Sequence, residues 1–329
     1  MNEADTLQSL DTYFRLMSMK GAVEVFHAAS RAGVLKAIAG ETTSAAAVAT
    51  ECGIDARAAN LVLDALAAIG LVTRTDAGYL PAPVLQFLTG TYEDLSNQYW
   101  AYLPEYLKTG LPMQRMDDPA EGMKVYATQA GSLYWMMLPA AVAAARMLGI
   151  GKERRNLQIL DVGAGSGVWS LTFAQNDPGA RVTAVDWPAV LQIASNIARK
   201  NGVAERFTAC PGDYHSVELG AERYDLAIVG NVAHLEREDR LVSLFRRLHA
   251  ALKPGGSLLV VDIFHGQPGG ELSAALYELG LALRTAQGRV HGRAALEACI
   301  RGGGFAGSTY QPIPVTPHTM GLLLAQKGM

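Results

Sequence analysis

Residues 158–170 of this chain read QILDVGAGSGVWS, and this stretch decides the fold. An apolar run leads into Gly163, Gly165 and Gly167, and the apolar positions after these glycines recur at helical intervals. The stretch is therefore predicted to be a strand, a tight turn and a helix. Glycine lets a ligand approach bare backbone, and the first N–H groups of a helix have no partner within the helix. We expect a polar or anionic ligand on this turn.

The spacing of the glycines disfavours a nicotinamide cofactor. A dinucleotide fingerprint reads G-x-G-x-x-G, and its third glycine would fall at position 168, where the chain has Val168. The next β-rich run, residues 180–186, ends in Asp186, about 25 residues after Asp161. A carboxylate at that strand end can accept hydrogen bonds from both hydroxyls of a ribose. These residues favour a ligand that contains a ribose.

Strands and helices alternate from residue 158 onward, which predicts an α/β fold with a mostly parallel sheet and helices on both faces. The predicted strands are 159–162, 182–185, 206–209, 224–229, 257–263, 305–312 and 320–326. The predicted helices are 168–175, 189–201, 237–252, 271–286 and 293–301. The run Lys253-Pro254-Gly255-Gly256 is interpreted as a helix stop and a turn before the strand at 257.

Polar side chains follow three further predicted strands. They are Gly212, Asp213 and Tyr214 after the third strand, Asn231 and His234 after the fourth, and Asp262 and His265 after the fifth. The carboxylate and ring at 213–214 could hold the amino group and the face of an adenine. Because ligands bind at the carboxyl ends of parallel strands, all these side chains are expected to belong to one site.

The first eighty residues predict a smaller helical domain. Apolar residues recur at helical spacing within the first forty residues, which are therefore predicted to be mainly helix. Two short helices follow, the first capped by Thr43 or Ser44 and the second by Asp55. Residues 71–80 then read as strand, turn and strand, so the order is that of a winged helix. DNA binding is disfavoured, because residues 20–80 carry five basic and six acidic side chains.

The composition is that of an ordinary globular chain of about two domains. Half of the 329 residues are hydrophobic, 18% are charged and the formal net charge is −3, so neither a nucleic-acid partner nor a membrane surface is expected. The polar start and the lack of a long apolar run predict a cytoplasmic protein. Three widely spaced cysteines indicate small core residues and not a metal site or a disulfide framework.

These motifs together resemble the class I S-adenosylmethionine-dependent O-methyltransferases of the caffeic acid and hydroxyindole type, in the branch that includes bacterial enzymes of natural-product biosynthesis. The resemblance rests on the glycine turn, Asp186-Trp187-Pro188, Gly212-Asp213-Tyr214 and Lys253-Pro254-Gly255-Gly256. The resemblance implies a helical winged-helix dimerisation domain over 1–110, a helical connector over 111–156 and a Rossmann-like catalytic domain over 157–329. It also implies a homodimer with S-adenosylmethionine as cofactor.

The resemblance assigns roles to individual residues. The implied cofactor residues are Asp161, Gly163, Gly165, Asp186, Trp187, Gly212, Asp213, Tyr214 and Asn231. Within this set, Gly163 and Asn231 are expected near the methionine portion and Asp186 at the ribose. The family's general base is a histidine after the fourth strand, which implies His234, and its carboxylate after the fifth strand is here Asp262. The family's aspartate after the histidine is replaced by Leu235, and a second helper Glu near residues 288–291 is missing.

The acceptor pocket is expected to be lined by rings and thioethers, which suit a flat aromatic substrate. The candidates are Tyr13, Phe14 and Met17 on the first helix, supplied by the partner subunit in the family, and Trp100, Tyr134, Trp135 and Met136 on the connector. The predicted reaction is O-methylation of an aromatic or polyketide-like small molecule. A carbon or nitrogen acceptor and a non-catalytic cofactor-binding regulator are the alternatives. No metal is expected, although His234, Asp262 and His265 would suit a divalent ion.

Overall fold

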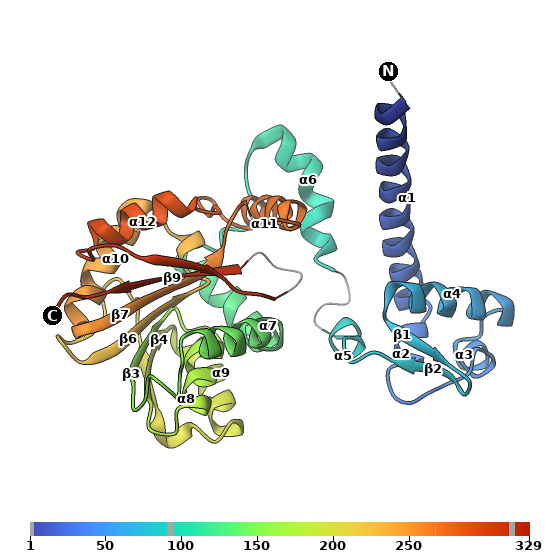
Figure 1. Cartoon of the computed structure of the whole chain (residues 1–329). Coiled ribbons are helices and arrows are strands. Elements are labelled where there is room, and N and C mark those ends of the chain that lie inside the picture. The colour runs from blue at the N-terminus through green and yellow to red at the C-terminus, as the bar shows by residue number, and fades with distance from the viewer. Residues whose placement is uncertain (1–2, 91–94, 267, 316–319) are drawn as a thin grey trace. The chain divides into compact units, whose positions relative to one another are not determined.

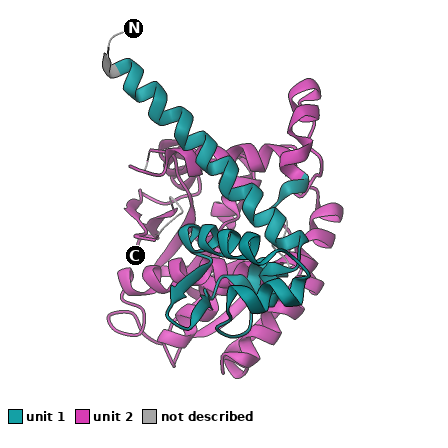
Figure 2. Cartoon of the chain, turned by 90° about the vertical axis from the view of Figure 1, so that its right-hand side faces the viewer, with its two compact units in different colours: residues 1–98 teal, residues 99–329 magenta. Residues whose placement is uncertain are grey.

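The computed structural model describes residues 3–90, 95–266, 268–315 and 320–329. The chain divides into two compact units, residues 1–98 and 99–329 (Figure 2). The finer division into three parts at residues 110 and 156 stays a prediction. Among the described residues, no helix is long and apolar enough to cross a membrane.

The first unit is mainly helical and contains one hairpin. Its elements are α1 (Glu3–Arg31), α2 (Val34–Ala37), α3 (Ala45–Cys52), α4 (Ala56–Ile69), β1 (Val72–Thr75), β2 (Gly78–Pro81) and α5 (Leu85–Leu88). Ser44 caps α3 by accepting the N–H of Ala47, and Asp55 caps α4 by accepting the N–H of Ala58 at 2.8 Å. The predicted order of helix, helix and hairpin is confirmed, and Ser44 is the cap, not Thr43.

The second unit is an α/β layer structure built on one sheet (Figure 1). Its helices are α6 (Asn97–Thr109), α7 (Pro119–Met147), α8 (Val168–Asn176), α9 (Pro188–Lys200), α10 (Glu238–Ala251), α11 (Glu271–Arg284) and α12 (Arg293–Gly302), with short 3₁₀ turns η1 (Ala204–Arg206) and η2 (Ala233–Leu235). Its strands are β3 (Gln158–Val162), β4 (Arg181–Asp186), β5 (Phe207–Pro211), β6 (Tyr224–Gly230), β7 (Leu252–Ile263), β8 (Thr309–Pro312) and β9 (Met320–Gln326).

The seven strands lie in the order β5-β4-β3-β6-β7-β9-β8. The first five are parallel, and β9 runs antiparallel to both of its neighbours. The order reverses between β3 and β6, so the crevice at the carboxyl ends of these two strands is where a ligand of an open α/β sheet binds. The sheet carries an apolar core on each face, as expected for strands with near-continuous apolar runs.

Two sequence expectations are wrong. The strand expected over 305–312 is limited to β8, which begins at Thr309. Residues 253–256 were expected to form a turn before the strand at 257, but β7 already begins at Leu252. Leu252 pairs with Tyr224 and Ser257 with Leu226, so the register shifts there as at a bulge. The extra residues are taken up within the strand, and Gly255 accommodates them with a φ of 75°.

Candidate active site

The glycine turn after β3 is tied to the neighbouring strand. The N–H groups of Gly163 and Ala164 both donate to the carbonyl of Val185, at 2.9 and 3.2 Å. Gly163, Gly165 and Gly167 all have φ values between 57° and 73°, in the left-handed region. A Cβ on Gly163 would lie 2.5 Å from Cγ2 of Val232, whereas a Cβ on Gly165 would meet nothing within 4 Å. The backbone at Gly165 therefore faces open space.

This difference predicts different effects of two alanine substitutions. Gly163→Ala should destabilise the protein more than Gly165→Ala, because both strain the backbone but only the first also clashes with Val232. Gly165→Ala should remain folded and lose affinity for the cofactor, since its methyl group occupies the open space. Thermal melting and calorimetric titration with S-adenosylmethionine would check both expectations. A Gly165→Ala protein with undiminished affinity would contradict this placement.

Asp186 joins the ends of three strands. It ends β4, and its two carboxylate oxygens accept the N–H of Gly165 at 2.8 Å and the N–H of Trp187 at 2.7 Å. Its carbonyl accepts the N–H of Gly212 after β5, at 3.0 Å. Burial raises the pKa of this carboxyl, and the two backbone hydrogen bonds oppose the rise. Each oxygen retains capacity to accept a further hydrogen bond.

Asp161 is turned into the protein. It is 1% exposed, and Oδ2 accepts a hydrogen bond of 2.5 Å from the hydroxyl of Ser170 on the first turn of α8. Burial raises the pKa of Asp161 to about 7, although the hydrogen bonds from Ser170 lower it. The side chain thus fixes α8 beneath the glycine turn, and its predicted contact with the cofactor stays a prediction.

Asn231 lies where β6 leaves the sheet. It has a φ of 58°, which is uncommon for a residue other than glycine. Its backbone N–H donates to the carbonyl of Val261, and its side-chain oxygen accepts the indole N–H of Trp169 at 3.2 Å. The residue that precedes it must be glycine, because a Cβ on Gly230 would collide with the Trp169 ring. The sheet and α8 together therefore hold the amide in place.

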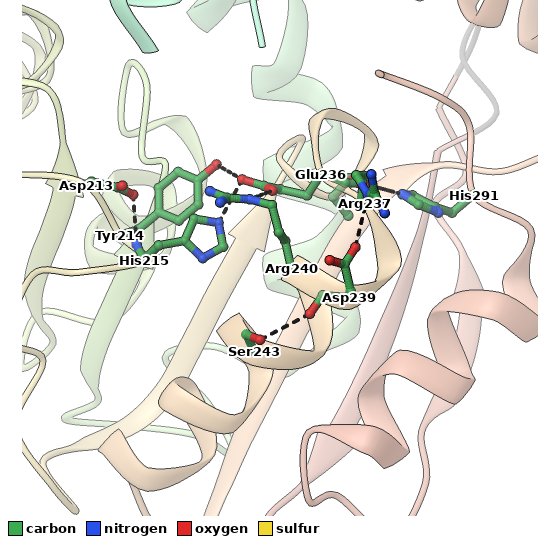
Figure 3. Close-up of polar contacts among 10 residues, drawn as sticks. Asp213, Tyr214, His215, Glu236, Arg237, Asp239, Arg240, Ser243 and His291 are labelled. Carbon is green, nitrogen blue, oxygen red and sulfur yellow. Dashed lines mark hydrogen bonds and ion pairs between the residues drawn. The ribbon is translucent and has the colours of Figure 1, made fainter. Parts of the chain in front are cut away.

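A buried carboxylate, Glu236, connects the loop after β5 with the turn after β6 (Figure 3). It accepts the hydroxyl of Tyr214 at 2.8 Å, bonds Nε2 of His215 at 2.8 Å and accepts Nε of Arg240 at 2.7 Å. Burial by itself would raise the pKa of Glu236, but these three partners lower it to about 2. Asp213 accepts the backbone N–H of His215 in the same loop. The loop predicted to surround adenine is thereby fixed to η2, which holds His234.

His234 and Asp262 form a buried pair at the carboxyl ends of β6 and β7. Nδ1 of His234 is 2.8 Å from Oδ1 of Asp262, and the backbone N–H of His234 donates to Oδ2 at 3.1 Å. The side chains are 7% and 2% exposed. In the neutral imidazole, a hydrogen bond from Nδ1 to this carboxylate assigns the ring proton to Nδ1 and makes Nε2 the acceptor nitrogen.

Tyr277 lies beside this pair, and Tyr126 is close enough to Tyr277 to affect it electrostatically. The hydroxyl of Tyr277 on α11 is 3.2 Å from Nε2 of His234, and the two rings meet edge to face with their centroids 5.5 Å apart. Burial and the charge of Asp262 raise the pKa of Tyr277, so its phenol stays protonated. Burial raises the pKa of Tyr126 on α7 to about 12, with smaller effects from Arg284 and Asp186. Neither tyrosine was singled out from the sequence.

The other predicted residues are distributed as follows. Tyr134 accepts a hydrogen bond from Asn201 at 2.7 Å, and Trp135 and Met136 lie half-buried beside it on α7. Trp100 is on α6, with 36% of its side chain exposed. Tyr13, Phe14 and Met17 lie exposed on α1, in the first unit. Their acceptor contacts stay predictions.

His265 does not join His234 and Asp262. Its Nε2 is 2.7 Å from Oε2 of Glu278, and both side chains are more than 40% exposed. Among the residues that the structure describes, no three His, Cys, Asp or Glu side chains are arranged to hold a metal.

Comparison with known proteins identifies the fold and the chemistry. Residues 159–256 match the family model described as "Methyltransferase domain". The chain is 24% identical over 272 residues to 3-hydroxy-5-methyl-1-naphthoate 3-O-methyltransferase of Streptomyces sahachiroi, covering 78% of this chain and 79% of that protein. It is 27% identical over 317 residues to acetylserotonin O-methyltransferase of Mus musculus molossinus, covering 87% and 81%. The structure of human N-acetylserotonin methyltransferase in complex with S-adenosylmethionine superposes with a TM-score of 0.71 at 19% identity, covering 100% and 99%.

The fold is therefore that of the class I methyltransferases. The chain carries a methyltransferase domain, and the resemblance to O-methyltransferases that the sequence motifs indicated is confirmed.

Proposed function

We propose that this enzyme O-methylates a phenolic hydroxyl of an aromatic small molecule, with His234 as the general base. The observation that carries the proposal is the buried pair of His234 and Asp262, which leaves Nε2 as an acceptor beside the Tyr277 hydroxyl. A phenol is mostly protonated near pH 7, so a base that removes its proton accelerates methyl transfer to the oxygen. Two relatives, named for a naphthoate and for acetylserotonin, support an aromatic acceptor.

The residues at the glycine turn suit S-adenosylmethionine. Asp186 has two oxygens for the ribose hydroxyls, and the open space over Gly165 admits a ligand against the backbone. Gly163 and Asn231 are assigned to the methionine portion, and Asp213, Tyr214 and Gly212 to the adenine, with Trp187 beside Asp186. When bound, the cofactor supplies a sulfonium methyl group for an in-line displacement. The protein contributes alignment and a dry site, which together favour such a transfer.

The side chains around His234 would move one proton. Asp262 holds the imidazole by Nδ1, so that Nε2 can take the proton of the acceptor hydroxyl and the imidazolium is stabilised by the carboxylate. The Tyr277 hydroxyl, which stays protonated, donates to Nε2 of His234 in this structure. The acceptor hydroxyl would take its place at Nε2, and Tyr277 would then donate to the oxygen that loses its proton. The family's aspartate after the histidine is absent, because Leu235 fills that position, and the imidazole is held by the carboxylate after the fifth strand instead.

The proposal is tested by the product. A panel of phenols incubated with S-adenosylmethionine carrying a ¹³C methyl group should yield methyl ethers, identified by mass and by the carbon NMR shift of the labelled methyl. A label attached to carbon or nitrogen would refute O-methylation and support the alternative acceptors. A protein that binds the cofactor but methylates no phenol would also count against the proposal.

A homodimer is part of the same proposal. Between residues 7 and 23, α1 exposes eight large apolar side chains, among them Leu7, Phe14 and Leu16 at 57–62% exposure. Large exposed apolar side chains concentrated on one helix are typical of an interaction site. A second copy of the chain would cover it, and Tyr13, Phe14 and Met17 would then be supplied to the acceptor by the partner subunit. Sedimentation equilibrium of Phe14→Glu against the unmodified protein would test this association.

A further inference from the structure

Arg284 brings a positive charge close to His234. It is the last residue of α11, and its guanidinium carbon lies 5.6 Å from the centroid of the Tyr277 ring. The hydroxyl of the same tyrosine is 3.2 Å from Nε2 of His234. A single aromatic ring thus links the guanidinium to the nitrogen proposed to take the acceptor's proton.

The charge of Arg284 acts on both tyrosines near His234. Burial raises the pKa of Tyr126 and of Tyr277, and in each case the positive charge of Arg284 opposes the rise. Tyr126 is also affected by the carboxylate of Asp186, which is assigned to the ribose. The guanidinium therefore shares one neighbourhood with the base and the proposed cofactor site.

Arg284 has no carboxylate partner among the described residues. No Asp or Glu oxygen in that part of the chain lies within 4.0 Å of its guanidinium. The carboxylate of Asp117, which is close enough to affect Tyr126, accepts the backbone N–H groups of Ala286 and Gln287 instead. Arg284 is half-buried, and removing a cation from water is unfavourable unless an anion or a ring compensates it. The guanidinium also donates a hydrogen bond to the Tyr277 side chain, and this one partner does not use all five of its N–H donors.

We infer that Arg284 binds a carboxylate of the acceptor, so that the substrate class is the phenolic aromatic acids. A guanidinium pairs with a carboxylate through two parallel hydrogen bonds, which fixes orientation as well as affinity. With its carboxylate on Arg284 and its hydroxyl at Nε2 of His234, a flat acceptor would be held at both ends beside Tyr277. This inference rests on the proposed function and adds to it the chemical class of the acceptor.

An arginine at the end of a helix can also simply compensate the helix dipole. Arg301 provides the matched comparison, because it lies in the last turn of α12 and is exposed. Arg284→Gln and Arg301→Gln remove the same charge from equivalent helix positions. Only the first of them is expected to change acceptor recognition.

The test compares acids with their neutral amides. The probes are 3-hydroxybenzoate, 4-hydroxybenzoate and 3-hydroxy-2-naphthoate, each paired with its carboxamide, with turnover measured in S-adenosylmethionine and binding in S-adenosylhomocysteine. For at least one pair, the unmodified enzyme should bind and methylate the acid at least tenfold better than the amide. Arg284→Gln should abolish this preference mainly through a higher KM for the acid, and Arg284→Lys should retain part of it. Arg301→Gln should behave like the unmodified enzyme.

Two outcomes would overturn the inference: no preference for any acid over its amide, or an equal loss of acid and amide in Arg284→Gln. The two readouts separate this failure from that of the proposed function. Acids that bind in an Arg284-dependent way without being methylated would sustain the carboxylate site and refute O-methylation. Equal methylation of acids and amides would sustain O-methylation and refute the carboxylate site.

Discussion

Replacing His234 by asparagine should lower kcat by about 10²–10⁴-fold with a weakly acidic phenol, the range that a general base contributes. The affinity for S-adenosylmethionine should change little, because the His234 side chain bonds Asp262 and Tyr277, neither of which is assigned to the cofactor. Asparagine keeps a polar side chain next to Asp262, so the buried carboxylate does not lose every partner. Steady-state kinetics together with calorimetric titration would separate the two effects.

His265→Asn is the matched control for this substitution. His265 also follows β7 by sequence, but it is exposed and bonded to Glu278. Its replacement should leave kcat within about twofold, as expected for an exposed pair of little energetic weight. If both variants lost activity equally, or if His234→Asn kept full activity, the assignment of the base would be wrong.

Replacing Asp186 by alanine should weaken the binding of S-adenosylmethionine by at least about 100-fold. The carboxylate is expected to hold two ribose hydroxyls, and a hydrogen bond to a charged group is worth about 1.5–3 kcal/mol. The substitution also leaves the N–H groups of Gly165 and Trp187 without their acceptor, so the glycine turn loses a support. Calorimetric titration with S-adenosylmethionine and S-adenosylhomocysteine would measure the change.

Two further variants show whether the lost affinity of Asp186→Ala comes from the missing carboxylate or from a damaged fold. Asp186→Asn keeps one oxygen acceptor for the turn and loses the other, so it should be less destabilised than Asp186→Ala while still losing most of the affinity. Asp239→Asn changes an exposed carboxylate on α10 and should bind the cofactor normally. Unchanged affinity in a folded Asp186→Asn protein would contradict the assignment of this residue to the ribose.

The cofactor half of the site was predictable because its signals are local. The glycines at 163, 165 and 167 must adopt positive φ values, and only their type permits it at low cost. Asp186 follows one strand later, and parallel topology brings the ends of neighbouring strands to one edge of the sheet. The hydrogen bond between Gly165 and Asp186 joins two residues that the sequence pattern had already paired.

The acceptor half was only partly predictable, because it depends on packing between distant segments. His234 was predictable from its place after a strand. Its contact with Tyr277, and the contact of Tyr277 with Arg284, depend on where α11 packs. Glu236 lies two residues after His234, and a lone carboxylate there looks like an ordinary exposed residue until Tyr214 and His215 reach it. Helix amphipathicity places α11, yet it does not reveal which ring faces the base.

The most direct test of the account compares two acceptors of different acidity in the unmodified enzyme and in His234→Asn. One acceptor should be a phenol that is protonated at the assay pH, and the other a nitro-substituted analogue of the same shape that is already ionised. The methyl-transfer rate should be measured in single turnovers with saturating S-adenosylmethionine. If His234 removes the acceptor's proton, the substitution should cost about 10²–10⁴-fold with the protonated phenol and only a few-fold with the ionised one. Equal losses with both acceptors would contradict this role.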